Sequence, residues 1–368
     1  MIRTLIVEDS AVEQALLTHI LESDPEITVV GNATDGEKAL VAAKELKPDV
    51  ITMDIHMPRL NGFETTRRIM ETNPVPIIIV SGSYFTDDAD KTFRAIEAGA
   101  LTIVRKPRGV GHPEFQDNAA ELIRTVKMMS EVKVVRRWPK PRRELPPPPL
   151  PVNAGRATTP EIRVVAIGAS TGGPAVLQEI FSALPKDLAV PILVVQHMAT
   201  GFMENFVKWL SAATGFPARV ATQGEPLSPG QAYFAPDGLH LQVSRDLRAV
   251  LTNDPPENGL RPAVSRLFRS VAETFGSRGM GVILTGMGRD GADDLKLLKM
   301  KGAVTVAQDQ ESSIIFGMPG EAVRLEAAEF VLAPERIASL LARLGRAGNS
   351  KALPTTRPEV KTTAGAFP

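Results

Sequence analysis

The chain has 368 residues, of which 42 are basic and 42 acidic, so its formal net charge is zero. This length predicts about two domains. The neutral balance argues against bulk attraction to nucleic acid or to an anionic membrane. The absence of cysteine excludes disulfides, thiolate catalysis and cysteine-based zinc sites. Acidic residues follow Met1 too soon for a signal peptide, and the apolar runs are strand-sized. We therefore expect a soluble cytoplasmic protein without membrane insertion.

Short apolar segments alternate with amphipathic segments in the N-terminal part of the chain. The predicted strands are Ile2–Val7, Thr28–Val30, Val50–Met53, Ile77–Val80 and Leu101–Val104. The predicted helices are Ala11–Leu21, Gly36–Lys47, Phe63–Glu71 and Asp87–Ala98, the last with Gly99 as its C-cap. The apolar strands are nearly continuous, as in a parallel sheet that is covered on both faces. This alternation predicts a doubly wound α/β domain.

A proline-rich stretch from Arg136 to Pro160 separates this domain from the rest. Proline fixes φ and removes a donor, so the stretch cannot continue a helix or a central strand. The run Pro146 to Pro149 predicts an extended spacer. Its basic residues could contact a partner, but a solvated linker is the favoured interpretation. We expect a first domain at 1–127, a linker at 128–161, a second domain at 162–345 and a disordered tail at 346–368.

The second domain repeats the α/β pattern. Its predicted strands are Ile162–Ile167, Ile192–Val195, Gly281–Leu284 and Ala303–Ala307, and a middle region from Ala218 to Thr252 is richer in turns and short strands. Its predicted helices are Pro174–Leu184, Gly201–Ala213, Pro262–Phe275, Ala292–Met300 and Pro334–Leu344.

Polar residues follow the predicted strands of the first domain. Glu8 and Asp9 follow the first strand, Asp54 the third, Ser81 the fourth and Lys106 the fifth. Ligands of an open parallel sheet gather at the carboxyl ends of its strands. Three neighbouring carboxylates suit Mg²⁺, and a hydroxyl with a lysine suits a phosphoryl group.

The segments VEDS, MDIHMPRLNG, VSGS and VRKP carry these residues in an order that resembles the receiver domain of two-component response regulators. The resemblance implies a flavodoxin-like domain with a parallel five-stranded sheet in the order 2-1-3-4-5. It implies that Asp54 accepts a phosphoryl group from a CheA-type histidine kinase. Glu8, Asp9 and Asp54 would hold Mg²⁺, while Ser81 and Lys106 would contact the phosphoryl oxygens.

Two residues depart from the common receiver pattern. His56 stands where such regulators often carry an acidic or other residue, and Ile103 stands at a position that is often aromatic and takes part in switching. The aliphatic Ile103 argues against the usual switch by an aromatic side chain, but not against phosphorylation.

The second domain opens with a glycine-rich turn around Ser170, in the segment IGASTGGP. A strand ends there and a helix begins, with proline in its first turn. Exposed N–H groups at such a turn bind anions or form an oxyanion hole. Taken alone, the turn favours the other interpretation, because glycine-rich turns more often bind phosphate or simply change the direction of the chain. The segment fits neither G-x-x-x-x-G-K-[ST] nor G-x-G-x-x-G, which disfavours a nucleotide site at this turn.

A serine nucleophile needs a base and an orienting carboxylate. His197 follows the predicted strand Ile192–Val195, on the same rim as Ser170, whereas His240 lies in a turn and is expected to be structural or peripheral. Asp290 follows the predicted strand Gly281–Leu284. Its alternative role is to cap the helix Ala292–Met300.

Asp293 and Asp294 lie in the first turn of that helix. We expect them to be solvated or to interact favourably with the helix dipole.

The segments GASTGGP, VVQHM, YFAPDGLHL, RPAVSRLFRSVA, GVILTGMGRDGA and AQDQESSIIFGMPGEA span nearly all of residues 162–345. Together they resemble the methylesterase domain of chemotaxis protein-glutamate methylesterases, the CheB family. A receiver, a linker and a doubly wound α/β methylesterase domain are that family's architecture, and the resemblance implies the same arrangement here. The order Ser, His, Asp distinguishes it from α/β-hydrolases, whose order along the chain is Ser, Asp, His.

The resemblance implies that Ser170, His197 and Asp290 are nucleophile, base and orienting acid, with Thr171 and Met287 supporting the oxyanion. It implies hydrolysis of glutamate γ-methyl esters on methyl-accepting chemotaxis receptors, deamidation of glutamine as a second activity, and no cofactor for the esterase chemistry.

We expect a monomer whose receiver obstructs the esterase site until Asp54 is phosphorylated. Leu260 and the segment Ala263-Val264-Ser265-Arg266 depart from the family pattern, and we expect them to alter substrate contacts. Two alternatives are a second domain that only binds a partner, and a DNA-binding regulator. Neutral charge and the lack of an evident helix-turn-helix disfavour the latter.

Overall fold

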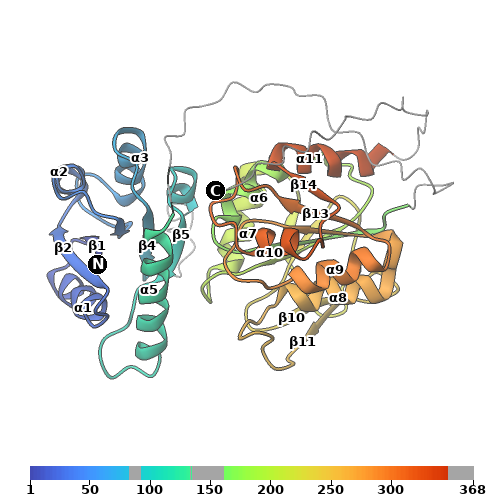
Figure 1. Cartoon of the computed structure of the whole chain (residues 1–368), viewed down its shortest axis with the longest axis horizontal. Coiled ribbons are helices and arrows are strands. Elements are labelled where there is room, and N and C mark those ends of the chain that lie inside the picture. The colour runs from blue at the N-terminus through green and yellow to red at the C-terminus, as the bar shows by residue number, and fades with distance from the viewer. Residues whose placement is uncertain (83–92, 133, 135–160, 347–368) are drawn as a thin grey trace, which may run out of the picture.

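The computed structural model describes residues 1–82, 93–132, 134 and 161–346. Two α/β domains lie side by side, the N-terminal one in blue to teal and the C-terminal one in green to red (Figure 1). Outside the described residues lie most of the predicted linker, the predicted tail after Arg346 and half of the predicted helix Asp87–Ala98.

The first domain is built on five parallel strands in the order β2-β1-β3-β4-β5. They are β1 (Ile2–Val7), β2 (Ile27–Ala33), β3 (Val50–Met53), β4 (Ile77–Ser81) and β5 (Thr102–Arg105). Its helices are α1 (Ala11–Glu22), α2 (Gly36–Leu46), α3 (Gly62–Thr72) and α5 (Phe115–Ser130), and residues 93–97 are also helical. The predicted sheet order is confirmed.

Side chains alternate along β1 between the two faces of this sheet. Leu5 and Val7 pack in the cluster that includes α2 and α3, whereas Ile6 packs with α1 and α5. The side chains of Ser10, Asp35 and Asn61 cap the first three helices by accepting hydrogen bonds from backbone N–H groups of the first turn. Both faces of the sheet are therefore covered, as the continuous apolar strands predicted.

The second domain has seven parallel strands in the order β14-β13-β12-β6-β7-β9-β8. They are β6 (Val164–Ala169), β7 (Ile192–Gln196), β8 (Ala218–Val220), β9 (Ala232–Phe234), β12 (Gly279–Ile283), β13 (Val304–Gln308) and β14 (Phe330–Leu332). An antiparallel hairpin, β10 (His240–Val243) and β11 (Ala249–Thr252), stands apart from this sheet. The predicted doubly wound α/β class is confirmed for both domains.

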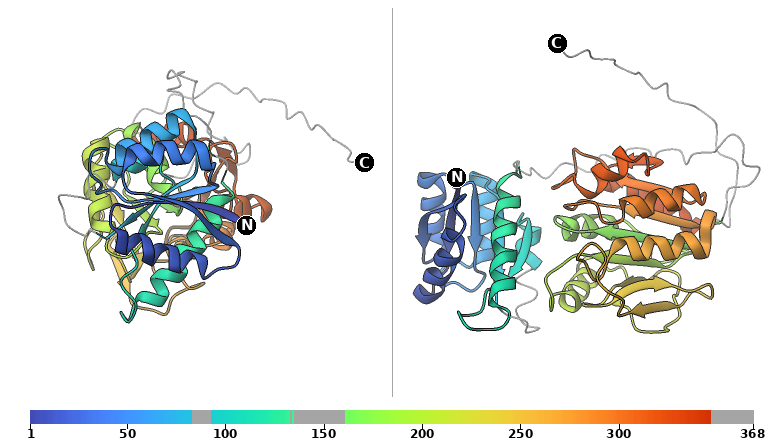
Figure 2. Two further views of the ribbon diagram at one scale, coloured as in Figure 1. Left: turned by 90° about the vertical axis from the view of Figure 1, so that its left-hand side faces the viewer. Right: turned by 60° about the horizontal axis from the view of Figure 1, so that its bottom comes forward.

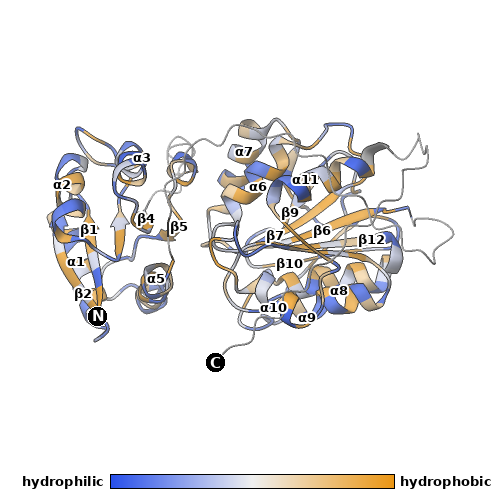
Figure 3. Cartoon of the chain, turned by 45° about the horizontal axis from the view of Figure 1, so that its top comes forward, coloured by the Kyte–Doolittle hydropathy of each residue, from blue (hydrophilic) through white to orange (hydrophobic). Residues whose placement is uncertain are grey.

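Helices cover both faces of the seven-stranded sheet (Figure 3). One face carries α6 (Gly173–Ser182), α7 (Met203–Thr214) and α11 (Pro334–Ala342), and the other carries α8 (Val264–Phe275), α9 (Ala292–Met300) and α10 (Met318–Arg324). Short 3₁₀ turns, η1 (Gly276–Arg278) and η2 (Arg343–Arg346), follow α8 and α11. Alternate residues of β6 face the two layers: Val165 and Ile167 pack towards α6, and Val164 and Ala166 towards α8.

Most predicted elements differ from the observed ones by one to three residues at their ends. Sequence analysis did not identify α5, α10 or β14. The last two are only seven and three residues long, too short for a periodic pattern to be distinguished from a loop.

The two domains contact each other through an aromatic cluster. Phe93 is fully buried, and its ring lies 5.5 Å from that of Phe206 and 5.4 Å from that of Trp209, both on α7. Gln178 on α6 also donates a hydrogen bond of 2.8 Å to Glu97. Figure 2 shows the strands of the second domain end-on to the first domain, so the rim where its candidate site lies faces the first domain.

Candidate functional site

Ser170 and His197 are placed side by side by two neighbouring parallel strands. Ala169 at the end of β6 is in register with Gln196 at the end of β7, and each candidate residue follows directly. The backbone N–H of His197 donates to Ala169 O at 2.9 Å, which extends the ladder by one step. The parallel pairing thus brings both side chains to one rim, as the sequence predicted.

The two residues line a common small cavity. Its second-domain lining is Ser170, Pro174, Gln196, His197 and Met198. Its remaining lining comes from the first domain and consists of Ile96, Thr102 and Ile103. The first domain therefore covers the cavity in this structure.

His197 lies against Asp290. Nε2 of the imidazole is 3.0 Å from Oδ2 of the carboxylate, and the two side chains are 12% and 2% exposed. Nε2 has no partner that meets hydrogen-bond geometry, so the ring N–H does not point straight at the carboxylate oxygen. Such pairs often tighten only when substrate is bound. Nδ1, the other ring nitrogen, is the one left for a nucleophile.

Asp290 is held at the N-terminus of α8. Its Oδ2 accepts from Val264 N at 2.6 Å and its Oδ1 from Ser265 N at 3.1 Å. A helix N-terminus offers unpaired donors and a favourable dipole to a carboxylate. Burial alone would raise the pKa of Asp290. The His197 imidazole and the hydrogen bonds from Ser265 and Val264 outweigh burial and hold the pKa below its usual value.

The alternative role for Asp290, as the cap of α9, is wrong. The N-cap residue of α9 is Gly291, and no side chain caps that helix. Asp290 instead reaches across to a different helix, α8, which begins 26 residues earlier in the chain.

Polar contacts continue behind Asp290. Ser265 Oγ accepts from Gly291 N at 3.0 Å. Asp294 is 7% exposed and pairs at 3.0 Å with Arg269, which also binds Glu257 at 2.6 Å. The expectation of a solvated side chain is therefore wrong for Asp294, because α9 turns this carboxylate towards α8. Asp293 remains exposed and pairs with Arg289 at 2.7 Å.

His240 is fully buried, as expected of a structural histidine. Its Nδ1 accepts from Ala263 N at 3.2 Å and its Nε2 lies 3.2 Å from Pro255 O. These contacts fix the chain just before α8.

The two residues expected to support an oxyanion present backbone donors near Ser170. Within the described ranges, neither Thr171 N nor Met287 N donates a hydrogen bond to the protein. The Met287 side chain is 50% exposed. A Cβ added to Gly286 would lie 2.7 Å from Ser170 Cβ, so the loop that carries Met287 passes directly against the nucleophile.

Sequence analysis missed three buried polar residues around this turn. Gln196 Nε2 donates to Ser170 O at 2.9 Å and to His197 O at 2.7 Å. Thr285 and Gln308 are fully buried and bond to each other and to neighbouring loops. A polar residue at the end of an otherwise apolar strand is the signal that could have identified all three.

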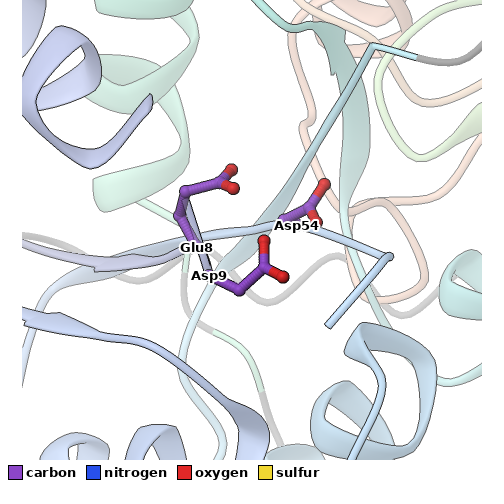
Figure 4. Close-up of side chains that lie close together, drawn as sticks. All are labelled: Glu8, Asp9 and Asp54. Carbon is purple, nitrogen blue, oxygen red and sulfur yellow. The ribbon is translucent and has the colours of Figure 1, made fainter. Parts of the chain in front are cut away.

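The first domain gathers a second polar cluster at its strand ends. Ligand oxygens of Glu8, Asp9 and Asp54 lie within 4.8 Å of one another, and Figure 4 shows the three carboxylates around one space. Glu8 and Asp54 are 1% and 5% exposed, while Asp9 is exposed. Buried carboxylate oxygens at this spacing fit the hard-oxygen preference of Mg²⁺.

Lys106 lies among these carboxylates. Its Nζ is 2.8 Å from Glu8 Oε2 and 3.3 Å from Asp54 Oδ1, and it also pairs with Glu13, which sequence analysis did not identify. Burial raises the pKa of Glu8 to about 7, despite the opposing bond from Lys106. Burial alone would lower the pKa of Lys106, but Asp54, Glu13 and Glu8 together raise it.

Ser81 ends β4, 1% exposed and in register with Arg105, directly before Lys106. It thus lies on the same rim as the carboxylates. His56 donates its backbone N–H to Asp54 Oδ2 at 3.0 Å. Among the described residues, no helix is both long and apolar enough to cross a membrane.

Comparisons with known proteins also divide the chain into two domains. The family model described as CheB methylesterase matches residues 165–341, and the response regulator receiver domain model matches residues 4–112. A protein-glutamate methylesterase/protein-glutamine glutaminase of Syntrophus aciditrophicus is 53% identical over 346 residues, with 94% of this chain and 98% of the relative covered. One of Geobacter metallireducens is 52% identical over 345 residues, with 94% and 99% covered.

Among solved structures, the CheB methylesterase catalytic domain of Thermotoga maritima is 35% identical, with a TM-score of 0.48. The match covers 50% of this chain and 98% of that one. The relatives matched over nearly their whole length identify both halves of the sequence. The chain belongs to the CheB methylesterase family, and it carries a response regulator receiver domain at its N-terminal end.

Proposed function

We propose that the protein is a phosphorylation-activated hydrolase that removes methyl groups from glutamate γ-methyl esters on methyl-accepting chemotaxis receptors. The observation that carries this proposal is the grouping of Ser170, His197 and Asp290 at adjacent strand ends. The names of the relatives, protein-glutamate methylesterase/protein-glutamine glutaminase, supply the substrate class.

In the proposed reaction, Ser170 Oγ attacks the ester carbonyl carbon while its proton passes to His197. Nδ1 is suited to take that proton, because Nε2 faces Asp290. Asp290 holds the imidazole in this tautomer and stabilises the imidazolium. The backbone N–H groups of Thr171 and Met287 are available to bind the oxyanion of the tetrahedral intermediate.

The methoxy group takes the proton from His197 and leaves as methanol, and an acyl-enzyme remains. Water then attacks the acyl carbon, with His197 again as base, and glutamate and free Ser170 are released. A glutamine carboxamide can pass through the same intermediate with ammonia as the leaving group. This supports deamidation as a second activity.

Asp54 is the proposed phosphoryl acceptor, and a CheA-type histidine kinase is the proposed donor. Glu8, Asp9 and Asp54 would hold Mg²⁺, which when bound neutralises phosphoryl charge. Lys106 and Ser81 lie on the same rim and are suited to contact the phosphoryl oxygens. We propose a cytoplasmic location and a monomeric state for this enzyme.

The receiver is proposed to inhibit the esterase by covering it. Ile96, Thr102 and Ile103 close one side of the cavity at Ser170, which leaves no room for a receptor helix. Phosphorylation of Asp54 would shift the population towards an open arrangement, and a shift from 1:99 to 99:1 requires about 5.5 kcal/mol. Ile103 stands where many receivers carry a switching aromatic residue, so here the switch would act through an aliphatic side chain.

The test measures methanol release from methyl-labelled receptor membranes, with and without a phosphodonor. We expect Ser170→Ala to abolish release while the fold remains intact, and near-normal release from that variant would overturn the nucleophile. A fragment of residues 162–368 should be faster than the unphosphorylated full-length chain. Equal rates would overturn inhibition by the receiver.

A further inference from the structure

The hydroxyl of Thr285 lies at the meeting point of three chain segments around the nucleophile. Thr285 follows β12 and is fully buried. Its Oγ1 accepts from Ile315 N at 3.0 Å, and its proton can go to Thr171 O at 3.0 Å or to Ile315 O at 3.2 Å. One side chain therefore joins the turn that carries Ser170 to the segment around Ile315.

The backbone of Thr285 adds two further bonds. Its carbonyl accepts from Ser170 N at 3.0 Å, and its N–H donates to Gln308 Oε1 at 2.8 Å. Gln308 is itself fixed, because its Nε2 donates to the backbone and side-chain oxygens of Ser312 at 3.0 and 3.1 Å. Thr285, which directly precedes the Gly286-Met287 loop, thus bonds to the backbone N–H of Ser170 and to the carbonyl of Thr171.

The segment 312–316, which we call the strap, also packs against the nucleophile turn. A Cβ added to Gly172 would lie 2.8 Å from Ile314 Cβ, so the Ile314 side chain rests on this glycine. Gly286 N donates to Ile315 O at 3.0 Å, which attaches the Met287 loop to the strap as well. Strap, nucleophile turn and Met287 loop form one bonded unit with Thr285 at its centre.

We propose that Thr285 is a positioning residue for the reaction of Ser170, an inference that rests on the proposed function. Its hydroxyl sets the spacing between the turn that carries Ser170 and Thr171 and the loop that carries Met287. Two oxyanion donors from separate loops stabilise a tetrahedral intermediate only if their separation is held. Displacement of such groups by about 1 Å can cost on the order of a hundredfold in rate.

The strap gives this unit a contact with the receiver. Ile314 and Ile315 pack against the apolar cluster of the receiver that includes Val104, Leu122 and Val126. Thr285 therefore lies between the receiver contact and Ser170, at the point where a shift of the strap would be transmitted to the nucleophile.

The experiment uses the full-length chain with a phosphodonor and a fluorophosphonate probe. Ser170 Oγ would attack the phosphorus and fluoride would leave, so labelling reports the nucleophile and oxyanion donors without a receptor. Thr285→Val retains the shape and removes the hydroxyl. We expect the maximal labelling rate to fall about tenfold to a hundredfold with an unchanged half-saturating probe concentration. Thr285→Ser retains the hydroxyl and should stay within about threefold.

Thr305 on β13 provides a matched control. It is also fully buried, and its hydroxyl donates to Ala327 O at 2.8 Å and accepts from Glu329 N at 3.0 Å. Thr305→Val therefore removes similar bonds at a site without a bond to the nucleophile turn. We expect it to lower the melting temperature as much as Thr285→Val while the labelling rate stays near wild type.

The outcomes separate this inference from the proposed function. Labelling of Ser170→Ala at the wild-type rate would overturn the proposed nucleophile. The role of Thr285 is overturned if Ser170→Ala is not labelled while the labelling rate of Thr285→Val stays within about twofold of wild type. It is also overturned if Thr285→Val and Thr305→Val slow labelling equally. Should either valine variant not fold, Thr285→Ala and Thr305→Ala make the same comparison.

Discussion

Phe93 of the receiver lies against Trp209 of the catalytic domain, with ring centroids 5.4 Å apart and an angle of 25° between the rings. Both side chains are almost completely buried, although they belong to different domains. Phe206 completes the cluster at 5.5 Å from Phe93. Aromatic pairs of this kind contribute about 0.5–1.5 kcal/mol beyond their buried area, so Phe93 is an apolar contact that helps to hold the receiver over the cavity.

Phe93→Ala should therefore raise the activity of the unphosphorylated chain. Loss of the ring weakens the closed arrangement, and about 1.4 kcal/mol corresponds to a tenfold change in its population. We expect methanol release without a phosphodonor to rise about tenfold. Trp209 fluorescence should shift to the red as the indole is exposed.

Combination with Asp54→Asn supplies the control for this prediction. The single Asp54→Asn variant should remain at the low basal rate whether or not a phosphodonor is present. The double variant should stay as active as Phe93→Ala, because opening no longer requires the phosphoryl group. An unchanged basal rate in Phe93→Ala would contradict a closed state held by this contact.

The Phe93 contact also illustrates a limit of sequence analysis. A buried phenylalanine on an amphipathic helix has the same pattern whether it packs in its own domain or against another. The strand-end residues were predictable for a different reason, because parallel strands bring their carboxyl ends to one rim. That rule placed Ser170, His197 and Asp290 together, and likewise Asp54 and Lys106, before their distances were known.

The surroundings of Asp290 were not predictable in the same way. Its partners Val264 and Ser265 lie 26 and 25 residues earlier in the chain. Nothing in the local sequence of Asp290 indicates which of two helix N-termini it will bind. Asp294 has the pattern of a solvated first-turn acid, and only the packing of α8 against α9 buries it.

Asp290→Asn tests the orienting role directly. An amide retains one acceptor for α8 but loses the charge that stabilises the imidazolium, so the maximal hydrolysis rate should fall about a thousandfold to ten-thousandfold. The free energy of unfolding should fall by about 1 kcal/mol, because a charged helix cap is lost. Asp293→Asn is the control, because Asp293 is exposed in the first turn of α9. It should change neither the hydrolysis rate nor the free energy of unfolding. Equal losses in both variants would contradict the assignment.

Arg269 should stabilise the fold, because its cation compensates the buried carboxylate of Asp294. Burial raises the pKa of Asp294, and the Arg269 cation opposes this effect. Arg269→Gln leaves Asp294 and Glu257 without their shared partner and should lower the free energy of unfolding in urea by about 1–2 kcal/mol. The double variant with Asp294→Asn should lose less than the sum of the single changes. Strict additivity would show that the pair is not coupled.

Glu8 predicts a pH dependence whose sign follows from its raised pKa. Burial raises this pKa from 4.5 to about 7, so between these values the unfolded chain ionises freely while the folded chain retains the proton. The contribution of Glu8 to stability is therefore fully present below about pH 4.5 and is lost as pH rises through about 7. Glu8→Gln should show a smaller fall in melting temperature from about pH 5 to about pH 8 than wild type.

Mg²⁺ should raise the wild-type melting temperature at the upper end of this range, because it compensates the ionised carboxylates, and should raise that of Glu8→Gln less. Glu121 is a matched control, since burial also raises its pKa, while Arg124 and Arg105 are its charged neighbours. Glu121→Gln should alter the pH profile but leave the full response to Mg²⁺, and an equal loss of that response in both variants would contradict a metal site at Glu8.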